Sequence, residues 1–143
     1  MIVRVTGPEV IVLLLDGRVL VAGSGRVGPA PQLNAEIFSP PYLFKGTRPT
    51  ISSVPTEAGY GGKFFVSTPD ATSITSVTLL RISAATHSFN MDQRFQRLSF
   101  AQAAGGLNVT APANGNLAPP GYYVLFILNG SGVPSPGAVI RIH

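Results

Sequence analysis

The sequence predicts an all-β protein built around an antiparallel β-sandwich, and three observations support this prediction. Short runs rich in β-branched and aromatic residues recur between residues 50 and 142, and clusters of Gly, Pro, Asn and Asp separate them. No long stretch repeats its apolar residues at the helical period of about 3.6. Seven short strands at this spacing, without helices, are typical of a two-sheet sandwich.

The strands of the sandwich follow from the β-rich runs between turn signals. They are expected at residues 50–54, 63–67, 76–82, 94–100, 107–110, 121–128 and 138–142. The run at 121–128, GYYVLFIL, is apolar on both faces of a regular strand. We therefore expect it to be a central strand with one face in the core, and its other face needs a cover.

The N-terminal part predicts a β-hairpin. Residues 10–15 and 19–22 are β-rich and flank Asp16-Gly17, a dipeptide that favours a type I′ turn. Both runs are apolar at nearly every position, which predicts burial on both faces, because a lone hairpin is marginal in water. Another short strand is expected at residues 35–38, where Pro40 and Pro41 end it.

Composition limits the classes of partner. The 143 residues are 45% apolar and only 11% charged, so we expect a partner to cover part of the surface. The net charge of +4 comes from scattered single residues, which argues against nucleic-acid binding. The apolar run at 10–15 is too short to span a membrane or to form most signal-peptide cores, so neither is expected. Without cysteine, disulfides, thiolate metal sites and cysteine nucleophiles are excluded.

The densest polar cluster lies at residues 79–98 and holds the only internal histidine, His87. One imidazole does not make a metal site, so an exposed loop histidine without a partner remains the alternative. Asp92 lies near Arg94, and we expect this pair to fix the loop by charge-assisted hydrogen bonds rather than to do acid-base work. Asn90 is expected to tie the same loop through turn-type bonds to the backbone. The three residues would hold His87 in place.

Other functional motifs are absent or weak. The sequence has no G-x-S-x-G nucleophile motif, and its second histidine is His143. The glycine-rich run at 23–28 lacks a G-K-S/T and a following helical pattern, so we interpret it as a loop rather than a phosphate site. Asn108 and Asn129 begin N-x-S/T sequons, which matter only if the chain passes through a eukaryotic secretory pathway.

Five segments, in the same order, resemble one family. They are DGRVLVAGSG at 16–25, AEIFSPPYLF at 35–44, Arg48-Pro49, ATHSFNMDQR at 85–94 and PGYYVLF at 120–126. Together they are similar to the C-terminal immunoglobulin-like (E-set) domain of the galactose oxidase and glyoxal oxidase family of copper radical oxidases. The resemblance covers most of the chain.

The resemblance implies an immunoglobulin-like antiparallel β-sandwich at residues 48–143. Residues 1–47 would be the remnant of the last blade of a seven-bladed propeller and a linker, so that the N-terminal hairpin is left from that blade. It also implies that His87 matches a loop histidine that ligates copper, that the sandwich packs on a propeller domain, and that the parent is secreted. The parent reaction would be oxidation of a primary alcohol or aldehyde, with oxygen reduced to peroxide.

The same resemblance shows which copper ligands this chain lacks. The family has a Tyr-His pair before the apolar strand that leads to D-G-R, and Pro8 and Glu9 stand at those places here. The other copper tyrosine and its cross-linked cysteine belong to absent propeller blades. We therefore expect an accessory domain that is inactive alone and holds no copper tightly. The alternative is a non-catalytic immunoglobulin-like binding or assembly module that self-associates through its N-terminal strands and forms a homo-oligomer.

Overall fold

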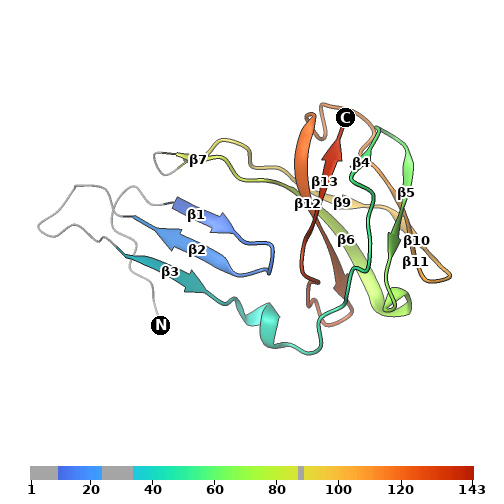
Figure 1. Ribbon diagram of the computed structural model, residues 1–143, viewed down its shortest axis with the longest axis horizontal. Coiled ribbons are helices and arrows are strands. Elements are labelled where there is room, and N and C mark those ends of the chain that lie inside the picture. Colours follow the sequence, from blue (N-terminus) through green and yellow to red (C-terminus); the bar gives the residue numbers. More distant parts are fainter. Residues whose placement is uncertain (1–9, 24–33, 87–88) are drawn as a thin grey trace, which may run out of the picture.

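The computed structural model describes residues 10–23, 34–86 and 89–143. It has two parts, a small N-terminal sheet and a larger sandwich, which lie side by side in Figure 1. The strands of the N-terminal sheet are β1 (Val10–Leu13), β2 (Val19–Ala22) and β3 (Ala35–Phe38). Those that follow are β4 (Glu57–Ala58), β5 (Lys63–Ser67), β6 (Ile74–Arg81), β7 (Ala85–Thr86), β8 (Phe89–Asn90), β9 (Phe95–Leu98), β10 (Phe100–Ala103), β11 (Gly106–Thr110), β12 (Gly121–Asn129) and β13 (Ala138–Ile142). Two short 3₁₀ helices, η1 (Pro41–Phe44) and η2 (Ala71–Ser73), complete the described elements.

The sandwich consists of a three-stranded and a five-stranded sheet. Their strand orders are β10-β11-β5 and β4-β13-β12-β6-β9, and all neighbours are antiparallel except β13 and β4. Alternate side chains of both sheets point into one core. Its fully buried members include Val66, Leu107, Val109, Leu79, Tyr123, Leu125, Ile127 and Ile140. The prediction of an all-β sandwich is confirmed.

Two predicted strands, 63–67 and 138–142, agree with β5 and β13 to the residue. The run at 94–100 is divided instead, because the chain changes sheets at Ser99: β9 pairs with β6, whereas β10 pairs with β11. Residues 50–54 form no named strand and contribute only the bridge between Ser53 and Ser67. The short strand β4, which pairs in parallel with the end of β13, was not predicted.

The outer face of β12 is partly covered by the chain itself. Val124 and Phe126 are 8% and 4% exposed, although they point away from the core. The backbone at Gly137 lies against both: a Cβ atom there would come within 2.4 Å of a Val124 methyl and 2.9 Å of the Phe126 ring. The outer face of β12 is not covered along its whole length, because Tyr122 on this face is 59% exposed.

The N-terminal hairpin is present, but its turn differs from the predicted one. Leu14 N–H donates to the Arg18 carbonyl and Gly17 N–H donates to the Leu14 carbonyl, so three residues close the loop instead of two. Gly17 has φ of 81°, which suits the left-handed position that ends such a three-residue loop. The type I′ prediction was therefore wrong.

The N-terminal strands are not buried on both faces, contrary to the prediction. β3 joins β2 to make a three-stranded sheet, and all four residues of β3 are exposed. Ile11 and Ile37 point to opposite faces of this sheet and are 53% and 51% exposed. Apolar composition therefore correctly predicted strands here, but the described chain does not supply the layers that would cover them.

Candidate functional site

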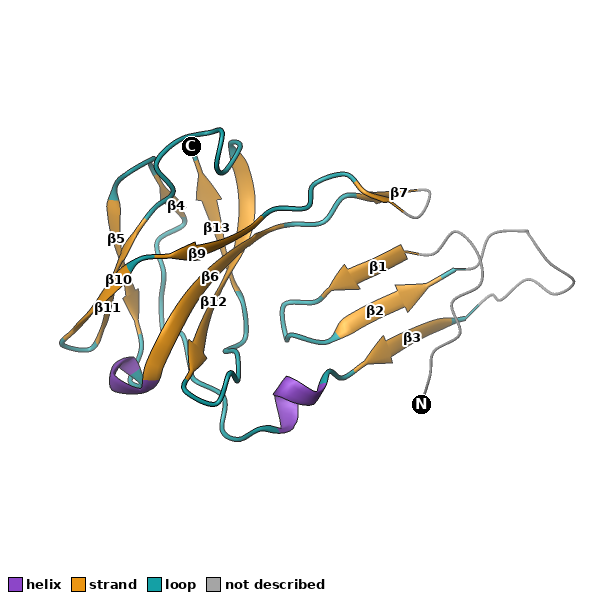
Figure 2. Ribbon diagram, turned by 180° about the vertical axis from the view of Figure 1, so that it is seen from behind, coloured by secondary structure: helices purple, strands orange, loops and turns teal. Residues whose placement is uncertain are grey.

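The two strands on either side of residues 87–88 project from the sandwich. β7 and β8 pair through Ala85 with Asn90 and Thr86 with Phe89, and this hairpin extends beside β1 (Figure 2). His87 lies outside the described residues. The structure thus places the strands on either side of the predicted metal ligand, whose role remains a prediction.

Asn90 ties the base of the β7–β8 hairpin, as predicted. Its side-chain oxygen accepts hydrogen bonds from the backbone N–H groups of Ala84 at 3.2 Å and Asp92 at 3.1 Å. Its amide nitrogen donates to the Ser83 hydroxyl at 3.1 Å. One side chain thus fixes both ends of the hairpin by satisfying backbone groups that the short ladder leaves unpaired.

Asp92 also acts structurally, but its arginine partner was not the predicted one. Its carboxylate lies 3.4 Å from Nε of Arg81, at the end of β6. The Arg94 side chain donates instead to the Gln93 carbonyl and is exposed. The Arg81 guanidinium also lies 5.9 Å from the centre of the Tyr123 ring. Arg81 therefore connects the base of the hairpin to the sandwich core.

Burial raises the pKa of the Tyr123 hydroxyl, and the neighbouring positive charge of Arg81 only partly opposes this effect. The hydroxyl donates a 2.6 Å hydrogen bond to the Pro119 carbonyl. Tyr123 is therefore a neutral structural hydrogen-bond donor at neutral pH rather than an acid or base.

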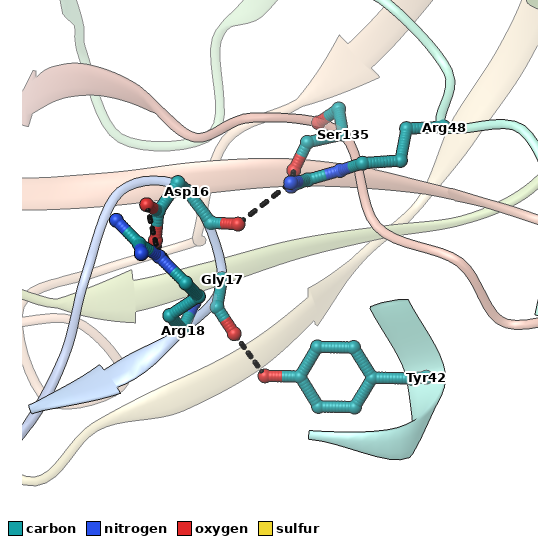
Figure 3. Close-up of polar contacts among 6 residues, drawn as sticks. All are labelled: Asp16, Gly17, Arg18, Tyr42, Arg48 and Ser135. Carbon is teal, nitrogen blue, oxygen red and sulfur yellow. Dashed lines mark hydrogen bonds and ion pairs between the residues drawn. The ribbon is translucent and has the colours of Figure 1, made fainter. Parts of the chain in front are cut away.

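A second group of contacts fastens the N-terminal hairpin to the sandwich. The Arg48 guanidinium donates to three carbonyls: Asp16 at 2.7 Å, Pro134 at 2.9 Å and Ser135 at 2.8 Å. The Tyr42 hydroxyl donates to the Gly17 carbonyl at 2.6 Å (Figure 3). We call Asp16, Gly17, Tyr42, Arg48 and Ser135 the hairpin clamp.

The hairpin clamp was not found by sequence reasoning. Arg48 was noticed only as part of a resembling dipeptide, since nothing in the local sequence identifies its distant acceptors. Burial raises the pKa of Tyr42, so its hydroxyl remains a donor. The pKa of Asp16 is lowered, chiefly by the hydrogen bond from the backbone N–H of Arg18, with further help from the Arg18 side chain at 2.6 Å.

A cleft of about 410 Å³ lies beside the hairpin clamp, between the N-terminal part of the chain and the outer face of the five-stranded sheet. Leu13 and Tyr42 line one side, and Arg97 and Phe126 line the other. A second hollow of about 390 Å³ adjoins it, because Leu13 and Phe95 line both. The two parts of the molecule therefore meet beside an incompletely filled junction, through the hairpin clamp and a hydrogen bond of 2.6 Å that the Gly137 N–H donates to the Leu15 carbonyl.

The N-terminal sheet and the β7–β8 hairpin lie at the same end of the molecule (Figure 1), and several large apolar side chains in or next to these elements are exposed. We call this set the apolar end; it comprises Ile11, Ile37, Phe38, Phe89 and Met91, which are 44–72% exposed. These side chains form an exposed apolar surface in the structure.

The described residues do not provide a copper site. Among them, no three His, Asp or Glu side chains come together as metal ligands, and the whole sequence has no cysteine. His143 lies 3.8 Å from Glu57, which also lies 3.6 Å from Arg141, so this histidine belongs to a surface charge cluster. A copper ion would need most of its ligands from elsewhere.

Comparison with known proteins gives a consistent result. Residues 48–142 match the family described as galactose oxidase-like, Early set domain. A galactose oxidase of Gibberella zeae is 37% identical over 139 residues, covering 91% of this chain and 20% of the relative. An aldehyde oxidase of Vitis pseudoreticulata is 38% identical over 150 residues, covering 91% of this chain and 28% of the relative.

A solved structure resembles the whole chain. It is a fungal alcohol oxidase of the AA5 family in complex with copper, which superposes with a TM-score of 0.87 at 27% identity. The match covers 99% of this chain and 32% of that one. The chain thus spans about a fifth to a third of the length of these three proteins. In the described part of the chain, no helix is long and apolar enough to cross a membrane.

Proposed function

The chain belongs to the galactose oxidase-like, Early set domain family, and on this premise we propose that it is the accessory domain of a copper radical oxidase. Residues 48–143 form the domain, and residues 1–47 are the remnant of the last propeller blade with its linker. In the whole protein, a primary alcohol or an aldehyde is oxidised and oxygen is reduced to peroxide. The chain alone is inactive.

The observation that carries this proposal is the apolar end, together with the hairpin that projects from the sandwich beside it. Ile11 and Ile37 leave both faces of the N-terminal sheet partly open, as expected for strands taken from a larger β-structure. Phe89 and Met91, next to the candidate histidine, are 72% and 71% exposed. A propeller packed on this end would cover all four side chains and receive the β7–β8 hairpin.

The contacts at the base of the hairpin support a positioning role toward a metal. Asn90 fixes the hairpin backbone, and Asp92 binds Arg81 on the central sheet. The strands of a hairpin held in this way would lose little conformational entropy on assembly. His87 would then offer one neutral imidazole, a donor well suited to Cu(II).

The isolated chain is inactive because it offers too few side chains that can ligate copper. One imidazole and water ligands hold copper weakly, and no three His, Asp or Glu side chains gather among the described residues. Titration of the full chain with Cu(II), followed by electron paramagnetic resonance, should give only weak binding. A submicromolar site lost on His87→Ala would contradict this part of the proposal.

A domain replacement tests the role of His87 directly. Residues 48–143 would replace the corresponding domain of the Gibberella zeae galactose oxidase, and copper content and galactose oxidation would be measured. We expect His87→Gln to abolish the characteristic copper signal and the activity, whereas the matched control His143→Gln leaves both unchanged. Equal copper content and activity in His87→Gln and the parent chimera would refute the assignment.

The second candidate function is a non-catalytic module that self-associates, and one observation favours it. β3 is an edge strand of the N-terminal sheet, and all four of its residues are exposed. An exposed edge of this kind pairs readily with a second copy. Light scattering should then show a dimer that Ile37→Lys dissociates. A monomer at high concentration would eliminate this candidate.

A further inference from the structure

One face of the sandwich lies away from the apolar end and carries a sequence motif that the proposed function does not use. This is the outer face of the three-stranded sheet, where β11 contains Asn108-Val109-Thr110. Val109 is fully buried in the core, so Asn108 and Thr110 point outward, and Asn108 is exposed. The motif has the form of an N-glycosylation sequon and lies on a rigid, central strand.

We propose that Asn108 is the acceptor of an asparagine-linked glycan in a eukaryotic secretory pathway, and that the first sugar packs on the exposed ring of Phe65. The donor is an oligosaccharide linked to a lipid pyrophosphate. Nδ2 of Asn108 forms a bond to C1 of the first N-acetylglucosamine and loses a proton, while the bond from C1 to the pyrophosphate oxygen breaks. The lipid pyrophosphate is the leaving group, and no oxidation or reduction takes place.

Phe65 is placed to receive the sugar. It lies directly opposite Asn108 in the antiparallel register of β5 and β11, so both side chains share the outer face. The Phe65 ring is held over Gly106, since a Cβ atom at Gly106 would come 2.6 Å from the ring. The ring is nevertheless 42% exposed. The apolar face of a sugar can cover such a ring and remove apolar area from water.

The second sequon, Asn129-Gly130-Ser131, has a different environment. The Asn129 side-chain oxygen accepts hydrogen bonds from Ser131 and Val133, and its amide nitrogen donates to the Thr47 carbonyl at 3.0 Å. Asn129 also lines the junction cleft. By contrast, the Asn108 side chain makes no hydrogen bond to other residues that the structure describes. A glycan at Asn108 therefore breaks no hydrogen bond that the Asn108 side chain makes to another described residue.

The location of Asn108 keeps the glycan away from the surface that the proposed oxidase partner would cover. β5, β10 and β11 lie on the far side of the sandwich from the N-terminal sheet and the β7–β8 hairpin (Figures 1 and 2). The glycan is thus compatible with propeller docking and does not depend on it.

The first test is to secrete the full chain from yeast and map its glycans. Intact mass and peptide mass would be measured before and after treatment with peptide N-glycosidase F, which converts the occupied Asn to Asp. We expect the glycan to disappear in Asn108→Gln and in Thr110→Val, and to remain in the matched control Asn129→Gln. A chain with no glycan, or with a glycan at Asn129 alone, overturns the proposal.

The second test examines packing on Phe65. Endoglycosidase H leaves one N-acetylglucosamine on Asn108, and this form would be compared by thermal unfolding with Asn108→Asp, the chemical equivalent of the fully deglycosylated chain. We expect the single sugar to raise the melting temperature by a few degrees in the parent, and to have little effect in Phe65→Ser. An equal increase in both backgrounds overturns the contact with Phe65.

Discussion

The sandwich and the N-terminal sheet are both rich in β-branched and apolar residues, yet they differ in burial. In the sandwich, Leu125 and Ile127 on β12 are fully buried between two sheets. In the N-terminal sheet, none of the residues of β1, β2 and β3 is fully buried, and Ile11 and Ile37 are more than half exposed. The difference shows that an apolar strand predicts a covering layer without indicating whether the same chain provides it.

The largest expected effect comes from removing a buried side chain of the sandwich. Leu125→Ala should lower the free energy of unfolding by about 2–5 kcal/mol, because it leaves a cavity in a core that cannot fully collapse. Ile37→Ala on β3 is the matched control and should cost less than about 1 kcal/mol, because its side chain is half exposed. Urea unfolding checks both values. Equal losses would mean that the N-terminal sheet is as well packed as the sandwich.

The second largest effect is expected at the hairpin clamp, which joins the N-terminal sheet to the sandwich. Arg48→Met should remove three charge-assisted hydrogen bonds and destabilise the attachment of β1 and β2 by about 1.5–3 kcal/mol. Hydrogen exchange should become faster in β1 and β2, while the amides of β6 and β12 remain protected. Arg18→Met is a suitable control, since Arg18 bonds only within its own turn. Uniformly faster exchange in both regions would contradict a local role for Arg48.

A smaller effect is expected at the turn that the clamp holds. Gly17 has φ of 81°, and a Cβ atom there would lie 3.3 Å from a Leu43 methyl. Gly17→Ala should therefore cost about 1–2 kcal/mol from the left-handed backbone alone. Gly23 has a similar φ of 78°, and a Cβ atom there would have no neighbour within 4 Å. Gly23→Ala therefore measures the cost of the left-handed backbone without a steric contact. Thermal unfolding of the two variants should show the larger loss for Gly17→Ala, and the reverse order would exclude a steric contribution.

The smallest expected effect is the pH dependence of stability that arises from Asp16. The pKa of Asp16 in the folded protein is below its ordinary value of 3.8, so its contribution to stability is present above about pH 4 and is lost as pH falls through the folded pKa. Because the carboxylate is 42% exposed, this contribution should be below about 1 kcal/mol. Asp16→Asn should make the stability of the parent and variant converge at low pH. A constant difference between pH 2 and pH 7 would show that ionisation of Asp16 is not involved.

Local sequence patterns sufficed wherever a strand is defined by its own alternation and the turns that bound it. The strands at 63–67 and 138–142 were predicted to the residue, because buried and exposed positions alternate along them. The run at 94–100 was not divided correctly, because a change of sheet at Ser99 depends on which strands lie beside it. The turn at Asp16-Gly17 was located but misjudged, since the Asp16 carboxylate binds Arg18 and stabilises a longer loop.

In the candidate site, too, local contacts were predicted from the sequence, whereas contacts between distant residues were not. Asn90 was identified from sequence because its partners lie within a few residues, at Ser83, Ala84 and Asp92. Asp92 was assigned to its neighbour Arg94, whereas pairing of β6 with β9 brings Arg81 closer. His87 was proposed from the resemblance of its surrounding string, and it lies outside the described residues.

The sequence by itself determined the all-β class, the family and most of the strands, because these depend on residue types and short spacings. Only the tertiary structure decided the partners of Arg48, which lie 32, 86 and 87 residues away in the chain. It also decided which apolar side chains remain open at the apolar end. Burial and long-range hydrogen bonds depend on how distant strands pack, and no local pattern encodes that packing.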